Sequence, residues 1–306
     1  MNSPDYISLQ WTTVQYNVFE LVGQTAAFGG YTVLIFLSSR MFIKRGIKTR
    51  LNRTLLAGSL FMYLLSTAYF AYTVVNVADR MNIFLDVALN KSIGLRGSFH
   101  DNITKWSPLF NAVVLVNYVF SDAVVIWRSW IITPVQHRRW IAIPVTLVFL
   151  ASVSVISTIV FRAIAFVQYP LVPVPKDTFI DRGINVLQLL SIGLSLLSNI
   201  SATFVVGIVA IQHRQTISAA FITAKHTRLT RGERILRLLV ESGLLYCISG
   251  LVLAVFCFIR LPHGTLGDIY TPVTVHISGA YPLIVFLLIK EEMSLDKTEF
   301  TLVLPT

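Results

Sequence analysis

Long hydrophobic runs separated by short polar stretches dominate the chain from Glu20 to Lys290. A helix needs about 20 largely apolar residues to cross the hydrocarbon core of a bilayer. Seven runs reach that length, and five of them contain no Asp, Glu, Lys or Arg. We therefore predict seven transmembrane helices, at about residues 20–39, 54–78, 106–130, 140–161, 183–212, 235–259 and 269–289.

The sixth of these helices carries a start signal of its own. Thr230 and Glu233 form a T-x-x-E capping box directly before the hydrophobic run. We expect this helix to begin at Arg231 and to run to about Phe258, which takes it beyond the membrane at its start.

Positive charges gather on one side of the predicted spans. Seventeen of the 25 Lys and Arg residues lie in the first, third and fifth connections, at the span ends beside them, or in the C-terminal tail. Because Lys and Arg are enriched beside the cytoplasmic ends of spans, we predict an all-α integral membrane bundle with its N-terminus outside and its C-terminus cytoplasmic. Residues 1–19 then form an extracellular N-terminus, residues 20–290 the transmembrane domain and residues 291–306 a short cytoplasmic tail.

Two glycosylation sequons agree with this orientation. Asn90 and Asn102 each begin an Asn-x-Ser/Thr triplet in the second connection, which the charge pattern places outside. Both are therefore glycosylation candidates.

Composition excludes a soluble globular domain and changes how the net charge is interpreted. Hydrophobic residues make up 55% of the chain and charged residues 13%, with a net charge of +10. We assign the excess charge to a cytoplasmic face beside anionic lipid rather than to nucleic-acid binding. The expected location is the plasma membrane or an endomembrane. Cys247 and Cys257 stand about 15 Å apart along one helix, so they cannot pair.

Polar residues inside the spans are the candidates for function, since such groups are costly in lipid and should face the bundle interior. Asp122 is the one acid within the third span, and its face also carries Asn111 and Tyr118. The candidate buried polar network is Asn111, Tyr118, Asp122, Asn199, Glu241 and His276. We expect Asp122 to hydrogen-bond Asn or Ser groups of neighbouring helices, with Asn199 as one such partner.

Each of these residues also has a purely structural interpretation. Small and polar residues pack helices together in lipid without any further role. Glu241 has a local partner in Arg237, four positions earlier, and that ion pair is the favoured interpretation. His276 has no second ligand-type residue beside it in sequence, so we expect no metal and no cofactor. We expect Trp127, Arg128 and Arg237 to close the cytoplasmic end of the bundle as a candidate gate.

Four stretches together resemble a known family. They are Asp122 to Trp130 (DAVVIWRSW), Ser195 to Thr203 (SLLSNISAT), Leu239 to Cys247 (LVESGLLYC) and Gly279 to Pro282 (GAYP). The chain is similar in these stretches to a large basidiomycete family of seven-helix membrane proteins, from mushroom-forming fungi, whose activity is unassigned. That resemblance implies the fold and a source group, and no chemistry.

Better-known seven-helix proteins fit less well. The places of the rhodopsin-like Asp/Glu-Arg-Tyr and Asn-Pro-x-x-Tyr motifs here read Trp127-Arg-Ser-Trp130 and Ala280-Tyr-Pro-Leu283, so the likeness to G-protein-coupled receptors is distant. A retinal protein needs a lysine inside helix seven, where the chain offers only Lys290 at the end. A zinc hydrolase needs several histidines within the spans, and only His276 lies well inside one.

These observations favour a receptor-like membrane protein and no enzyme. We expect it to sense an external or membrane-dissolved ligand and to signal to a cytosolic partner such as a G protein. A transporter or channel is the alternative, and a membrane-embedded hydrolase is the least favoured class.

Overall fold

The computed structural model describes residues 3–45, 50–89, 94–169, 178–220, 231–261 and 265–303. Within this part of the chain seven α-helices are long and apolar enough to cross a membrane, so the protein is a multi-pass, all-helical membrane bundle. The helices are α1 (Ser3–Arg45), α2 (Arg50–Ala88), α3 (Gly94–Ile132), α4 (Ala142–Gln168), α5 (Phe179–Ala220), α6 (Arg231–Phe258) and α7 (Leu266–Val303). A short 3-10 helix, η1 (Val135–Ile141), joins α3 to α4.

The helices are longer than the hydrophobic runs that predict them. The 43 residues of α1 span about 64 Å at about 1.5 Å per residue, roughly twice the thickness of the hydrocarbon core. The 28-residue α6 is described from Arg231 to Phe258, which confirms the predicted end. Thr230 of the capping box lies outside the described residues, so the predicted start stays a prediction. An unpredicted capping box starts α7, where Asp268 Oδ2 accepts a hydrogen bond of 2.7 Å from the backbone nitrogen of Thr265.

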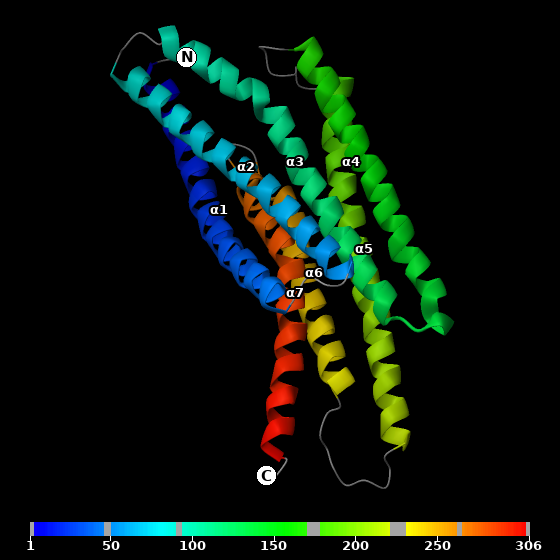
Figure 1. Cartoon of the computed structure of the whole chain (residues 1–306). Helices are drawn as coiled ribbons and strands as arrows, with labels where there is room; N and C mark the ends of the chain where they lie inside the picture. Colours follow the sequence, from blue (N-terminus) through cyan, green and yellow to red (C-terminus); the bar gives the residue numbers. More distant parts are fainter. Residues whose placement is uncertain are drawn as a thin grey trace.

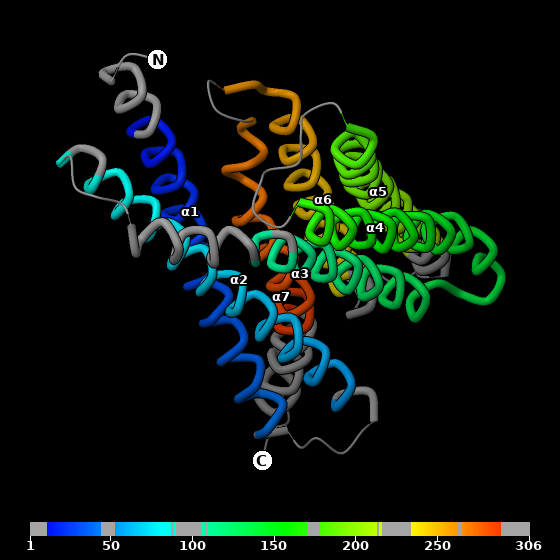
Figure 2. The backbone as a smooth tube through the Cα atoms, turned by 90° about the horizontal axis from the view of Figure 1, so that it is seen from above, coloured from blue at the N-terminus to red at the C-terminus, as the bar shows by residue number. Residues whose placement is uncertain are grey.

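The seven helices close into a ring with α3 through its middle. Each helix packs against the next along the chain, and α7 packs against α1. In addition α3 contacts α5 and α7, and Figures 1 and 2 show it between the α1–α2 pair and the α4–α5 pair. An odd number of spans places the chain ends at opposite ends of the bundle (Figure 1), which we call the N-terminal and C-terminal ends.

Large hydrophobic side chains cover the outside of this bundle. Phe36, Phe149 and Phe204 are 66%, 67% and 68% exposed, which water would penalise but lipid favours. Only a small part of most spans is buried inside the bundle, for example 22% of the span in α1. The share reaches 56% in α7, because four helices surround α7. The surface is therefore that of a protein in a bilayer, and α7 and α3 form its interior.

Close contact between α1 and α7 depends on one glycine. A Cβ atom on Gly279 would lie 2.8 Å from the hydroxyl and 2.9 Å from two ring carbons of Tyr31. Tyr31 is 1% exposed and packs with Ile35, Ala280 and Leu283 in one buried cluster. Small residues allow helix backbones to approach closely in membranes, and here the glycine makes room for an aromatic ring.

Candidate functional site

The centre of the polar interior is Asp122 of α3, which is 2% exposed. Asn199 of α5 donates a hydrogen bond from Nδ2 to Asp122 Oδ1 over 2.7 Å. The same nitrogen donates to the carbonyl of Ser195, one turn earlier, over 2.9 Å. The predicted contact between Asp122 and Asn199 is thereby confirmed, and the partner of the buried acid is a neutral amide.

Hydroxyl groups extend this network from α3 to α6 and α7. The hydroxyls of Tyr118 and Thr274 lie 2.6 Å apart. Ser121 Oγ lies 3.0 Å from the Tyr246 hydroxyl and donates to the Ser278 carbonyl over 3.1 Å. Four helices therefore meet through polar contacts around one face of α3, as the side-chain spacing along that helix predicts.

A small cavity lies within this network. Its volume is about 50 Å³, and its walls come from α3, α4, α5, α6 and α7. Asp122, Asn199, Tyr118, Tyr246 and Thr274 supply polar groups to it, while most of the remaining wall is apolar. A cavity needs roughly 10–15 Å³ to hold one water molecule, so this one has room for a few waters in this conformation.

Arg128 lies about two turns further along α3, toward the C-terminal end, and is 7% exposed. Its Nη1 donates a hydrogen bond to the Tyr281 hydroxyl of α7. Among the described residues, its Nε and Nη2 have no hydrogen-bond partner. A Cβ atom on Gly243 of α6 would lie 3.2 Å from that Nη2 and 2.8 Å from Thr203 Oγ1 of α5. The guanidinium is therefore enclosed where α5, α6 and α7 meet α3.

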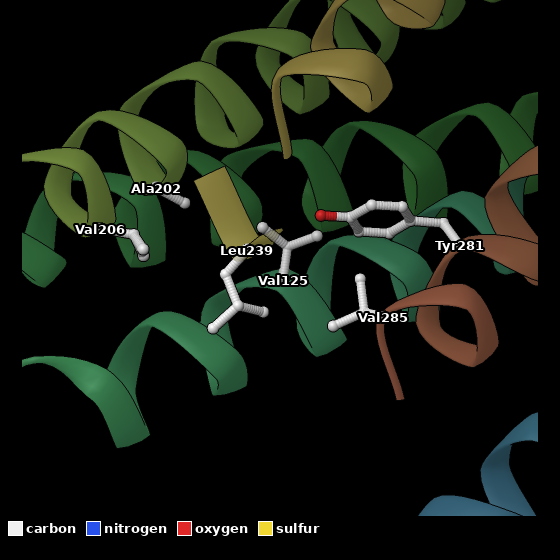
Figure 3. Close-up of a cluster of buried hydrophobic side chains, with 6 residues drawn as sticks. All are labelled: Val125, Ala202, Val206, Leu239, Tyr281 and Val285. Atoms are coloured by element: carbon white, nitrogen blue, oxygen red, sulfur yellow. The ribbon is translucent and has the colours of Figure 1, made fainter. Parts of the chain in front are cut away.

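Apolar side chains pack around Tyr281, the hydrogen-bond partner of Arg128. Figure 3 shows this buried cluster, in which the Tyr281 ring points its hydroxyl group toward side chains of the other helices. Its members, drawn from α3, α5, α6 and α7, are Val125, Ala202, Val206, Leu239, Tyr281 and Val285. A guanidinium keeps its charge at any physiological pH, so this apolar setting makes its burial costly.

The other two predicted gate residues are less buried than Arg128. Trp127 is half-buried and lines a cavity of about 130 Å³ between α1, α2, α3 and α7, which Arg128 and Tyr281 also line. Arg237 is on the surface, with its Nε 2.7 Å from Oε1 of Glu241 and both side chains more than half exposed. Of the proposed gate, only Arg128 is enclosed by the helices of the central network.

Two further members of the predicted network need correction. Glu241 does not reach the buried network, because it forms the local ion pair with Arg237 that the i, i+4 spacing favoured. His276 is fully buried on the other side of α7, where its ring centroid is 5.3 Å from that of Phe28 in α1. Two residues of helix rotate the side chain by about 200° from Thr274, which turns His276 away from the cavity.

Asn111 also lies apart from Asp122. It donates a hydrogen bond from Nδ2 to Ser107 over 3.4 Å and lines a separate cavity near the N-terminal end, between α1, α2 and α3. Leu115, Tyr118 and Asp122 do share the central cavity. The helical face of α3 was thus predicted correctly. That face lines two separate cavities, with Asn111 at one and Leu115, Tyr118 and Asp122 at the other.

Sequence reasoning missed several buried polar residues. Tyr281 was not identified as the partner of Arg128, although it stands in the GAYP stretch. Asn117 is fully buried and donates from Nδ2 to Ser66 Oγ over 2.8 Å, which joins α3 to α2. Gln24 of α1 is fully buried, and neither side-chain polar atom has a partner among the described residues. For Asn117 and Gln24 the only signal is an amide inside an apolar run, which does not identify the facing helix.

The structure also describes the metal-ligating residue types, the two cysteines and one of the two glycosylation candidates. Among the described residues, no group of three or more His, Cys, Asp or Glu could hold a metal ion, and both cysteines are free. Asn90 lies outside the described residues, while Asn102 lies in α3 with its side chain outside the described part.

The chain matches no family model, no curated protein and no solved structure.

Proposed function

We propose that the protein is a receptor-like membrane protein whose C-terminal end faces the cytosol, and that it belongs with the seven-helix proteins of mushroom-forming fungi. Two features of the interior support a signalling role. The cavity beside Asp122 and the enclosed Arg128 are built from the same helices, α3, α5, α6 and α7. A change in the cavity therefore acts on the contacts that enclose the guanidinium.

The observation that carries the proposal is the enclosed guanidinium of Arg128. One of its nitrogens is bonded to Tyr281, while Nε and Nη2 have no partner among the described residues. Leaving a charged donor buried and unpaired costs several kcal/mol, roughly, in a low-dielectric interior. Movement of α6 away from α3 would give these donors water or an acceptor on a cytosolic partner. In this proposal, opening at α6 lowers the cost of burying the guanidinium.

The small central cavity supports the same mechanism. A volume of about 50 Å³ is too small for most organic ligands. A ligand that binds beside Asp122 must therefore separate α5 or α6 from α3. Because binding then favours the conformation in which Arg128 is released, ligand and cytosolic partner stabilise the same state.

Purified protein in nanodiscs, mixed with a purified heterotrimeric G protein, tests this function directly. We expect the wild-type protein to accelerate nucleotide exchange above the basal rate, and Arg128→Gln to abolish the effect. The matched control is Arg237→Gln, which removes an exposed arginine of the same cytosolic face. Equal acceleration by wild type and Arg128→Gln would contradict the role given to the guanidinium.

A parallel measurement distinguishes the alternative, a transporter or channel. The same preparations are reconstituted into liposomes, and the uptake of small ions and organic solutes is followed. A carrier binds its substrate near the membrane midplane and opens alternately to both sides. Saturable flux that Asp122→Asn abolishes, from a protein that does not accelerate nucleotide exchange, would show that the protein is a carrier rather than a receptor.

A further inference from the structure

A second cavity lies near the N-terminal end, away from the Asp122 network. Its volume is about 110 Å³, and it lies between α1, α2 and α3. Every residue that lines it carries a polar group, and two of them, Glu20 of α1 and Arg80 of α2, carry opposite charges. The central cavity, by contrast, has mostly apolar walls.

The spacing of polar residues along α2 creates most of this cavity. Tyr69, Thr73, Asn76 and Arg80 follow i, i+4, i+7 and i+11, which places them on one helical face. All four line the cavity. A polar stripe of this length inside a membrane bundle is unfavourable unless water or a ligand meets it.

The two charged side chains remain available to a ligand. Arg80 donates from Nε to Asn76 Oδ1 over 3.3 Å, which orients the guanidinium. The two terminal nitrogens of a guanidinium carry four further N–H groups in a planar fork that suits a carboxylate. Glu20 is half-buried on the facing helix and lines the same cavity.

The remaining wall offers neutral donors and acceptors. Asn111 and Ser107 approach the cavity from α3, and their side chains lie 3.4 Å apart. A cavity needs roughly 10–15 Å³ to hold one water molecule, so a cavity of about 110 Å³ has room for several waters or for a small organic ligand. The ligand is therefore small, polar and able to meet both a carboxylate and a guanidinium.

We propose that this cavity binds a small zwitterion whose ammonium and carboxylate groups are one or two carbons apart. Glu20 accepts hydrogen bonds from the ammonium group, Arg80 donates to the carboxylate, and Asn111 lies along the side. An anion alone leaves Glu20 unmatched, and a cation alone leaves Arg80 unmatched. This site is independent of receptor activity, because Glu20 and Arg80 belong to α1 and α2, which supply none of the residues that enclose Arg128 in the central network.

Binding of radiolabelled glycine to the full chain in nanodiscs tests this site. We expect saturable binding that unlabelled glycine and β-alanine displace, and that acetate or methylamine displaces much less. Glu20→Gln and Arg80→Gln should each weaken binding by about tenfold or more, because each loses one charge-assisted contact. The control is the double variant Arg237→Gln, Glu241→Gln, which removes an exposed pair of the same two charges elsewhere.

A milder variant covers the case in which a charge-neutralising variant fails to fold. Arg80→Lys keeps the positive charge but loses the planar fork, so we expect binding to persist with reduced affinity. Absence of saturable glycine binding to the folded wild-type protein would overturn the proposal. Glycine binding that is equal in wild type and Arg80→Gln, or displacement by methylamine as effective as by glycine, would also overturn it.

Discussion

Asn199 Nδ2 lies 2.7 Å from Asp122 Oδ1, so an amide of α5 satisfies the one acid in the middle of α3. The two residues stand 77 positions apart in the chain. Their contact fixes the rotation of both helices, since neither side chain can turn toward lipid without leaving a polar group unpaired.

Removing the Asn199 amide should therefore destabilise the fold more than replacing the Asp122 carboxylate by an amide. We expect Asn199→Ala to lower the free energy of unfolding by about 1–2 kcal/mol, because it leaves a buried carboxylate without this donor. Asp122→Asn keeps an amide that can pair with Asn199 and should change stability by less than about 1 kcal/mol. Thermal unfolding in detergent measures both. The control is Asn17→Ala, which removes only a local bond to the Thr13 carbonyl; an equal loss in Asn17→Ala and Asn199→Ala would contradict this account.

Replacing Tyr281 should lower the stability of the fold more than replacing Arg128, although the two side chains are bonded to each other. Tyr281→Phe removes the acceptor of a buried guanidinium and should destabilise the fold by about 1–3 kcal/mol. Arg128→Met replaces a buried charge by an apolar chain of similar length, and such replacements are often neutral or stabilising by about 1–4 kcal/mol.

A double-mutant cycle over these two positions isolates the contact. In the Arg128→Met background, Tyr281→Phe should have little further effect, because the hydroxyl no longer receives the guanidinium hydrogen bond. Chemical unfolding of the four proteins provides the free energies. Additive losses would mean that the two side chains do not interact in the folded protein.

Gly279 should tolerate no side chain. Gly279→Ala places a Cβ atom 2.8–2.9 Å from the Tyr31 ring, so the helices must separate, at a cost of about 1–3 kcal/mol. Gly193→Ala is the matched control, since no atom lies within 4 Å of its added Cβ. That change should be neutral or stabilise α5 by up to about 1 kcal/mol. Melting temperatures of the two variants report the difference. In a Tyr31→Ala background, which is itself less stable, Gly279→Ala should cost less than it does in the wild-type protein.

The orientation of the chain is open to chemical labelling. We expect Asn90 and Asn102 to carry glycans in a eukaryotic host, because the charge pattern places their connection outside. Cysteine substitutions at Lys44 and Lys225 should react with a membrane-impermeant maleimide only after the membrane is permeabilised. Reaction of the Lys44→Cys protein in sealed right-side-out vesicles would show that the orientation is the opposite of the predicted one.

Local features of the chain were predicted correctly from the sequence. Seven apolar runs indicate seven spanning helices because the lipid leaves a backbone no other way to satisfy its polar groups. The ion pair of Arg237 with Glu241 follows from residues four positions apart, which any helix brings together. The Asp122 face was also readable, since helical periodicity alone places Leu115, Tyr118 and Asp122 in one row.

Only the tertiary structure decides which inward-facing rows of side chains on different helices contact one another. It places Tyr281 against Arg128, brings Glu20 and Arg80 to one cavity, and turns His276 toward α1 rather than toward Asp122. These outcomes depend on the rotation and tilt of each helix within the ring. Those are set by close packing at positions such as Gly279, whose partner lies in another helix. Periodicity shows that a polar side chain must face inward, but the choice among several inward-facing neighbours belongs to the packed bundle.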